Sequence, residues 1–172
     1  MKIQESSRIL DKGAGKVYDS PIRKDERRDR VEMLDTLQEL YQKYDETAAR
    51  IRAEAPKFSG LWGMGADPKN HPAHLEFYNG VAAWVEEFLA SGPDPKAAAD
   101  AARIMLGAAN QRRKEESYWY TYAAQSHVIP LIPYMDAADC KELADWYDTL
   151  YTKLERMPIQ RELYKKLRKA AK

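Results

Sequence analysis

Apolar residues recur every three or four positions over most of the chain, which is the spacing of one face of an α-helix. The clearest stretch begins at Ser20, a good helix cap, and Pro21, a good first helical residue, and no further glycine or proline occurs before Pro56. The sequence therefore predicts a long helix over residues 20–55. Its apolar stripe consists of Val31, Leu34, Leu37, Tyr41, Tyr44, Ala48, Ile51 and Ala55.

A straight helix over residues 20–55 would be about 52 Å long at the usual rise per residue. A compact domain of this chain length is only about 40 Å across. Either the helix breaks or one end projects, and the charged run at residues 23–30 is the end that we expect to project. We expect these charges to form a solvated face. The alternative is a coiled-coil or partner-binding arm.

The rest of the chain predicts shorter helices at about residues 72–90, 94–112, 115–129, 136–156 and 158–170. Residues 1–19 are expected to be weakly structured and residues 56–72 to form a loop, because glycine and proline interrupt both. Pro130 and Pro133 are expected to kink or end the helix before them. No segment shows the alternation of a strand, and the helical hairpins differ too much for an internal repeat. The predicted fold is all-α: a single-domain helical bundle over residues 20–172, with about five main helices and a long N-terminal one.

The chain of 172 residues carries 28 Lys and Arg against 27 Asp and Glu, a formal net charge of +1, which argues against a strong overall field. Residues 1–57 hold 13 basic and 12 acidic groups, residues 58–152 hold 7 and 13, and residues 153–172 hold 8 and 2, so the nets are +1, −6 and +6. The last segment predicts an amphipathic basic helix that we expect to dock on the acidic middle; binding to nucleic acid or another anionic surface is the alternative. Its candidate surface cations are Lys165, Lys166, Arg168 and Lys169.

The N-terminal residues lack the apolar core of a secretory signal, and no apolar run approaches the roughly 18 residues that a membrane span needs. A single cysteine, Cys140, excludes an intramolecular disulfide framework. These features favour a cytoplasmic location. Cys140 lies near a predicted helix start, which can lower a thiol pKa, but Asp139 and Glu142 oppose that effect. We therefore expect a structural thiol.

His71 and His74 form a His-x-x-His pair, which is a weak candidate for a metal site. The alternative is a capping or surface role, because Pro72 makes His71 the helix cap and the positive end of a helix disfavours a cation. His127 lies in an apolar segment near tyrosines, where it is either a general base or ligand-binding group or, as we expect, a core histidine. The sequence contains no Glu-x-x-His spacing of di-iron bundles and no established cofactor motif, so no cofactor is expected.

The aromatic composition favours tyrosine and tryptophan, with 11 Tyr and 4 Trp against 3 Phe. These residues suit positions where one side of a ring is buried and the other meets water, a ligand or a partner. The structural interpretation is that these residues form the core and that the tyrosine hydroxyls reach the surface. The functional hypothesis is a groove or interface. Its candidate residues, with His127, are Trp62, Met64, Tyr118, Trp119 and Tyr122.

Together these observations favour a non-catalytic helical interaction or regulatory module, either self-associating through the helix at 20–55 or binding a protein partner. The second hypothesis is a small-molecule- or metal-binding bundle, an enzyme being one form of it, with its pocket under the 56–72 loop. The third is binding of nucleic acid or an anionic surface by the basic C-terminal helix.

Overall fold

Helices account for nearly all of the chain that the computed structural model describes, which is residues 21–54, 71–107, 123–150 and 156–172. In chain order they are α1 (Pro21–Glu54), α2 (Pro72–Ala90), α3 (Pro95–Leu106), the 3₁₀ helix η3 (Gln125–Tyr134), α5 (Ala137–Leu150) and α6 (Pro158–Ala170). The described residues contain no strand, so the predicted all-α, single-domain bundle is confirmed. None of the described helices has both the length and the apolar character needed to cross a membrane.

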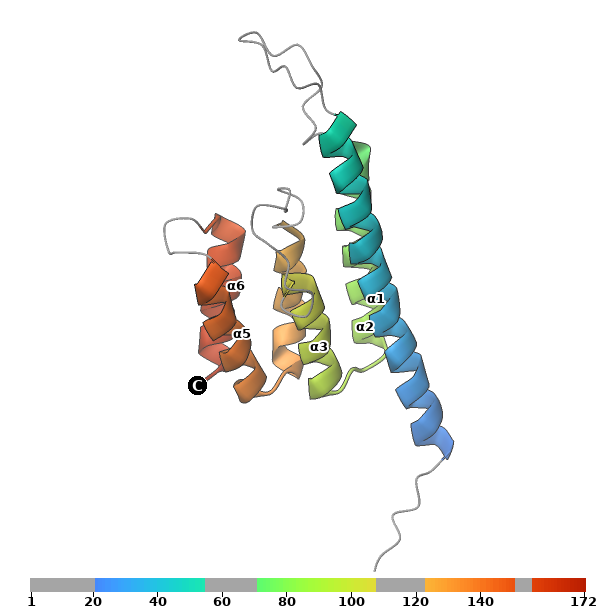
Figure 1. Ribbon diagram of the computed structural model, residues 1–172. Helices are drawn as coiled ribbons and strands as arrows, with labels where there is room; N and C mark the ends of the chain where they lie inside the picture. The colour runs from blue at the N-terminus through green and yellow to red at the C-terminus, as the bar shows by residue number, and fades with distance from the viewer. Residues whose placement is uncertain (1–20, 55–70, 108–122, 151–155) are drawn as a thin grey trace, which may run out of the picture.

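The helices form three antiparallel hairpins placed side by side in a row (Figure 1). The pairs are α1 with α2, α3 with η3, and α5 with α6. Neighbouring hairpins join because α1 and α5 both pack on α3, while α2 and α6 both pack on η3. The chain thus builds a regular row of hairpins although its sequence shows no internal repeat.

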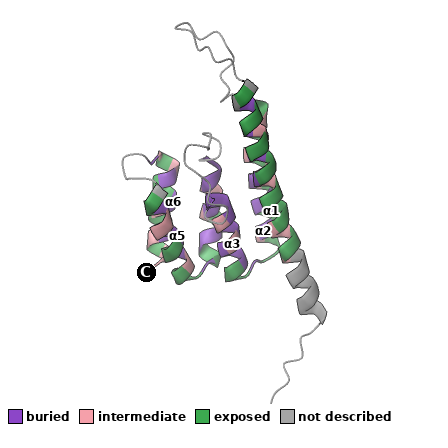
Figure 2. Ribbon diagram, in the orientation of Figure 1, coloured by how far each residue is buried: buried purple, intermediate pink, exposed green. Residues whose placement is uncertain are grey.

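The α3–η3 hairpin lies in the middle of the row and is the most buried part of the molecule (Figure 2). Small side chains on α3 allow its neighbours to approach closely. The buried alanines of α3 are Ala97, Ala98, Ala99, Ala101 and Ala102. On its exposed edge, Arg103 pairs with Asp139 at 2.6 Å and Glu142 at 3.0 Å, which ties α3 to α5.

The long first helix is unbroken, and its N-terminal end projects beyond the other helices (Figure 1). The prediction of one long helix with a projecting end is therefore confirmed. Leu37, Tyr41 and Ala48 face the neighbouring helices and are buried. Trp84 of α2 adds a hydrogen bond across the hairpin, from its indole N–H to the carbonyl oxygen of Met33 at 3.0 Å.

The prediction that Pro130 and Pro133 kink or end an α-helix is wrong. The chain leaves α-helical geometry after Ala124, and η3 runs through both prolines to Tyr134. A proline ring fixes φ near −65°, and a 3₁₀ helix uses φ of about −50 to −70°. This φ fits a 3₁₀ helix and an α-helix alike. The 3₁₀ geometry differs in avoiding the clash that an interior proline ring makes with the carbonyl four residues earlier in an α-helix. Residues 115–122 of the predicted helix lie outside the described residues.

Three residues per turn give η3 three ridges along its length. Gln125, Val128 and Leu131 share one ridge and are buried, whereas Pro130 and Pro133 share another and are exposed. The triplets Val-Ile-Pro and Leu-Ile-Pro thus repeat with the period of the helix that they form.

Two other predicted helix ends also differ from the structure. The helix predicted at 94–112 ends at Leu106, because Gly107 adopts a left-handed conformation with φ 80° that closes the helix. The helix predicted at 136–156 is described as Ala137–Leu150, and Arg156 lies outside any helix.

Candidate functional site

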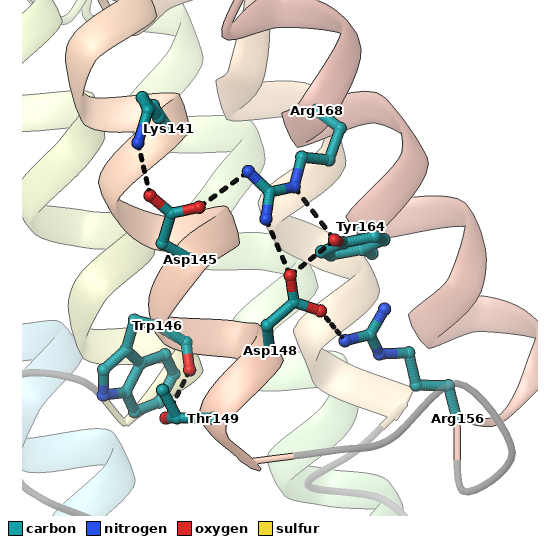
Figure 3. A network of polar contacts seen from close by, with 8 residues as sticks. All are labelled: Lys141, Asp145, Trp146, Asp148, Thr149, Arg156, Tyr164 and Arg168. Atoms are coloured by element: carbon teal, nitrogen blue, oxygen red, sulfur yellow. Dashed lines mark hydrogen bonds and ion pairs between the residues drawn. The ribbon is translucent and has the colours of Figure 1, made fainter.

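The C-terminal helix α6 is held in place by its inner face. Leu163 and Leu167 on this face are completely buried. Arg168 extends from the same helix to α5, where its guanidinium donates to Asp145 at 2.6 Å and to Asp148 at 2.7 Å (Figure 3). The basic helix therefore docks on acidic residues of the middle segment, as the charge distribution predicts.

Tyr164 lies at the centre of this contact (Figure 3). Its hydroxyl donates to Asp148 at 2.6 Å and accepts from the Arg168 Nε at 2.9 Å. The guanidinium of Arg156, which is almost fully buried, stacks 3.9 Å from the centre of the tyrosine ring and also pairs with Asp148. The sequence could have suggested part of this network, because Tyr164 and Arg168 are four residues apart on one helix face.

Asp148 stays ionised in this network. Its carboxylate accepts hydrogen bonds from the side chains of Tyr164, Arg156 and Arg168. Burial alone would raise the pKa of Asp148, but these hydrogen bonds outweigh it and hold the pKa at about 2. The pKa of Arg168 is raised, first by its hydrogen bond with Tyr164 and then by its bond with Asp148. Near neutral pH, both the carboxylate and the guanidinium in the contact between α5 and α6 are therefore charged.

The outer face of α6 is different, because it carries exposed cations. We call four of them the cationic stripe: Arg161, Lys165 and Lys169 on one side of the helix, and Lys172 just beyond its C-terminal end. The Nε of Arg161 also donates to the carbonyl oxygen of Arg156 at 2.8 Å. Lys166 lies at the edge of this stripe, 3.7 Å from Glu162. Of the four predicted surface cations, the structure therefore places Lys165, Lys166 and Lys169 outward and turns Arg168 inward.

The His-x-x-His pair is divided between two structural roles. His71 caps α2, because its Nδ1 accepts a hydrogen bond from the Ala73 N–H at 3.2 Å. His74 is fully buried and shares a hydrogen bond of 2.9 Å with the Tyr44 hydroxyl of α1. The described residues contain no group of three His, Cys, Asp or Glu side chains placed to hold a metal ion.

A groove with a volume of about 270 Å³ lies between α1 and α2, beside these histidines. Lys43, Arg50 and His71 contribute its basic groups, and Tyr44 and Phe77 contribute aromatic surface. It lies at the end of the hairpin where α1 ends and α2 begins. The pocket predicted under the 56–72 loop stays a prediction. The loop itself lies outside the described residues.

His127 packs on α2, with its ring centre 4.6 Å from that of Tyr78. Burial lowers the pKa of His127, and a hydrogen bond with the backbone of Tyr78 opposes that change. Cys140 is buried in α5, and its pKa is raised by burial and by the neighbouring Asp139 and Asp136. This environment suits a structural thiol rather than a nucleophile.

The hypothesis of an aromatic groove rests on residues that the structure does not describe, namely Trp62, Met64, Tyr118, Trp119 and Tyr122. An aromatic cluster is present between α1 and α2. Tyr44 stacks on Phe77 with ring centres 3.9 Å apart, and Tyr41 meets the same ring edge-on at 4.9 Å. These aromatic rings belong to the core of the hairpin.

No protein-family model, curated protein or solved structure matches this chain.

Proposed function

We propose that this chain is a non-catalytic helical interaction module that binds an acidic protein surface through the cationic stripe of α6. The observation that supports this function is the division of the helix into two faces. Leu163, Leu167 and Arg168 hold the inner face on the bundle. The lysines of the stripe are therefore presented on a helix that other residues hold in place.

A protein surface fits this stripe better than a nucleic acid does. Single-stranded nucleic acids are commonly bound by stacking bases on exposed aromatic rings, but the Tyr164 ring is covered by the guanidinium of Arg156. Arginine is the preferred partner of phosphate, and Arg156 and Arg168 of this region are turned towards Asp148.

The test compares two variants with the same change in net charge. The α6 reversal is Lys165→Glu/Lys169→Glu/Lys172→Glu. The control variant is Lys43→Glu/Arg50→Glu/Lys96→Glu, whose positions are exposed on α1 and α3. Each tagged chain is incubated with a nuclease-treated cell extract, joined to its partners by a zero-length carbodiimide crosslinker and analysed by mass spectrometry.

We expect the unmodified chain and the control variant to give crosslinks from the lysines of α6 to Asp or Glu of a partner. The α6 reversal should lose them. The proposal fails if the same proteins are captured by the α6 reversal. It also fails if capture occurs only from extract that has not been treated with nuclease, or if the stripe binds a DNA duplex and gives no lysine-to-carboxylate crosslink.

A further inference from the structure

The outward face of α1 carries a row of carboxylates. We call them the acidic stripe, and all four are exposed: Glu32, Asp35, Glu39 and Glu46. Their separations of three, four and seven residues keep them on one side of a helix. The row is about 21 Å long at the usual helical rise. Exposed Lys43 and Arg50 lie on the same side of the helix, so the acidic character is greatest over residues 32–39.

This stripe faces away from the bundle. Leu37, Tyr41 and Tyr44 on the same helix are buried against the neighbouring helices, and the acidic stripe lies on the opposite side of the helix from them. Glu46 keeps its place with a hydrogen bond from the Gln42 amide at 3.2 Å. The acidic stripe is thus a fixed, exposed edge of the molecule.

The cationic stripe of α6 matches it in length and opposes it in sign. From Arg161 to Lys172 this stripe covers about 17 Å along α6 and the two residues that follow it. Both stripes run along straight helices, so two such edges can lie against each other with several opposite charges in register. Within one chain they are kept apart, because α1 and α6 belong to the hairpins at opposite ends of the row (Figure 1).

We propose that the two stripes meet between molecules, with α6 of one copy docked on α1 of a second copy. This inference rests on the proposed function and names a second copy of the chain as the acidic partner. The balance of charge supports it, because a net charge of +1 leaves little repulsion between copies. Opposite ends of the row then attract, and the fields of the two stripes orient the encounter.

The contact joins two different surfaces, so it is heterologous. Each docked copy keeps an unused acidic stripe at one end and an unused cationic stripe at the other. Such a contact builds open chains or rings rather than a closed two-fold dimer. Because exposed ion pairs are individually weak and are screened by salt, the assembly forms at high protein concentration and dissociates as salt is added.

Sedimentation velocity over a protein concentration series tests this inference. In about 50 mM NaCl, where charges act over distances beyond 10 Å, the weight-average mass of the unmodified chain should rise with concentration. In about 500 mM NaCl, where the screening length is only a few ångströms, it should return to the monomer value. The α6 reversal should remain monomeric in both buffers. The control variant should assemble at least as strongly as the unmodified chain, because Lys43→Glu and Arg50→Glu add carboxylates to the α1 face that carries the acidic stripe.

A charge exchange makes the test specific. The α1 reversal, Glu32→Lys/Glu39→Lys/Glu46→Lys, should also remain monomeric alone. An equal mixture of the α6 and α1 reversals should assemble again, because each stripe then meets one of opposite sign. Neutral variants with glutamine at the same positions should lose assembly too, and circular dichroism should show native helix content in every variant.

Three results would overturn the inference: an unmodified chain that stays monomeric in low salt, a reversal that assembles normally, or a mixture that stays monomeric. The proposed function fails separately. If the chain stays monomeric but its α6 lysines still crosslink to carboxylates of another protein, only the identity of the partner is wrong. If the α6 reversal changes neither assembly nor capture, both proposals fail.

Discussion

Asp148 shows how a single surface residue can become a structural centre. It lies on the outer side of α5, yet Tyr164 and two arginines converge on its carboxylate. The sequence predicted the basic character of the last helix but not this convergence. The Asp148 position has no local partner in the sequence, and its partners come from α6 and from the segment before it.

The low pKa of Asp148 predicts how stability depends on acid. Because a pKa of about 2 in the folded chain lies below the ordinary value, the carboxylate stabilises the fold fully above about pH 4 and loses that effect as the pH falls towards 2. Asp148→Asn should cost about 1 kcal/mol at pH 7, a value reduced for the 40 % exposure of the carboxylate. In urea unfolding, the difference from the unmodified chain should shrink at pH 2.

Glu162→Gln is the control for this experiment, because its only described ion pair is the 3.7 Å contact with Lys166. It should leave the free energy of unfolding nearly unchanged at either pH. An equal loss for Asp148→Asn at pH 7 and pH 2 would show that the carboxylate charge is not what stabilises the network.

The environment of His127 predicts a second pH dependence of folding stability, near neutral pH. Burial lowers its pKa, so below the ordinary value of about 6.5 the unfolded chain takes up a proton before the folded chain does. Stability from the neutral ring is complete above that pH and is lost as the pH falls through the folded pKa. In thermal unfolding between pH 7.5 and 5.5, His127→Gln should lose less stability on acidification than the unmodified chain. If His127→Gln and the unmodified chain lose the same stability on acidification, the assignment to His127 is wrong.

At the scale of the elements, the sequence predicted correctly the helices that begin at a proline. It predicted wrongly the helix that contains two prolines. Pro21, Pro72 and Pro158 stand at helix starts, and the predicted starts agree with the structure. Apolar spacing alone could not distinguish η3 from an α-helix, because both bury one side. The period-three triplets carry the distinguishing signal, since a 3₁₀ helix places residues three apart directly above one another, whereas an α-helix turns them by about 60°.

This geometry predicts an unusual response to proline replacement. In an α-helix, changing an interior proline to alanine would stabilise the fold by about 3 kcal/mol. In η3 the ring fits the backbone, so Pro133→Ala should destabilise it by about 0.4–1 kcal/mol because the unfolded chain gains freedom. Urea unfolding of Pro133→Ala and Pro130→Ala measures this. A gain in stability for either variant would show that the prolines strain the helix.

At the scale of the whole molecule, the sequence predicted the fold class and the opposite charges of its segments, but not where those charges lie. Helix spacing fixes which residues share a face. It does not fix which helices are neighbours, because that depends on packing between distant segments. Only the row of hairpins shows that the acidic stripe and the cationic stripe lie at opposite ends. The candidate aromatic residues at 62–64 and 118–122 stay a prediction.

The row of hairpins has a further consequence for how the molecule opens. The central α3–η3 hairpin packs on both neighbours, whereas each outer hairpin packs mainly on the centre. Either end can therefore detach by breaking one set of contacts while the rest of the core holds. Such opening would release α1 or α6 from the bundle without global unfolding. The two edges that differ in charge are thus also the parts whose local stability can be adjusted independently.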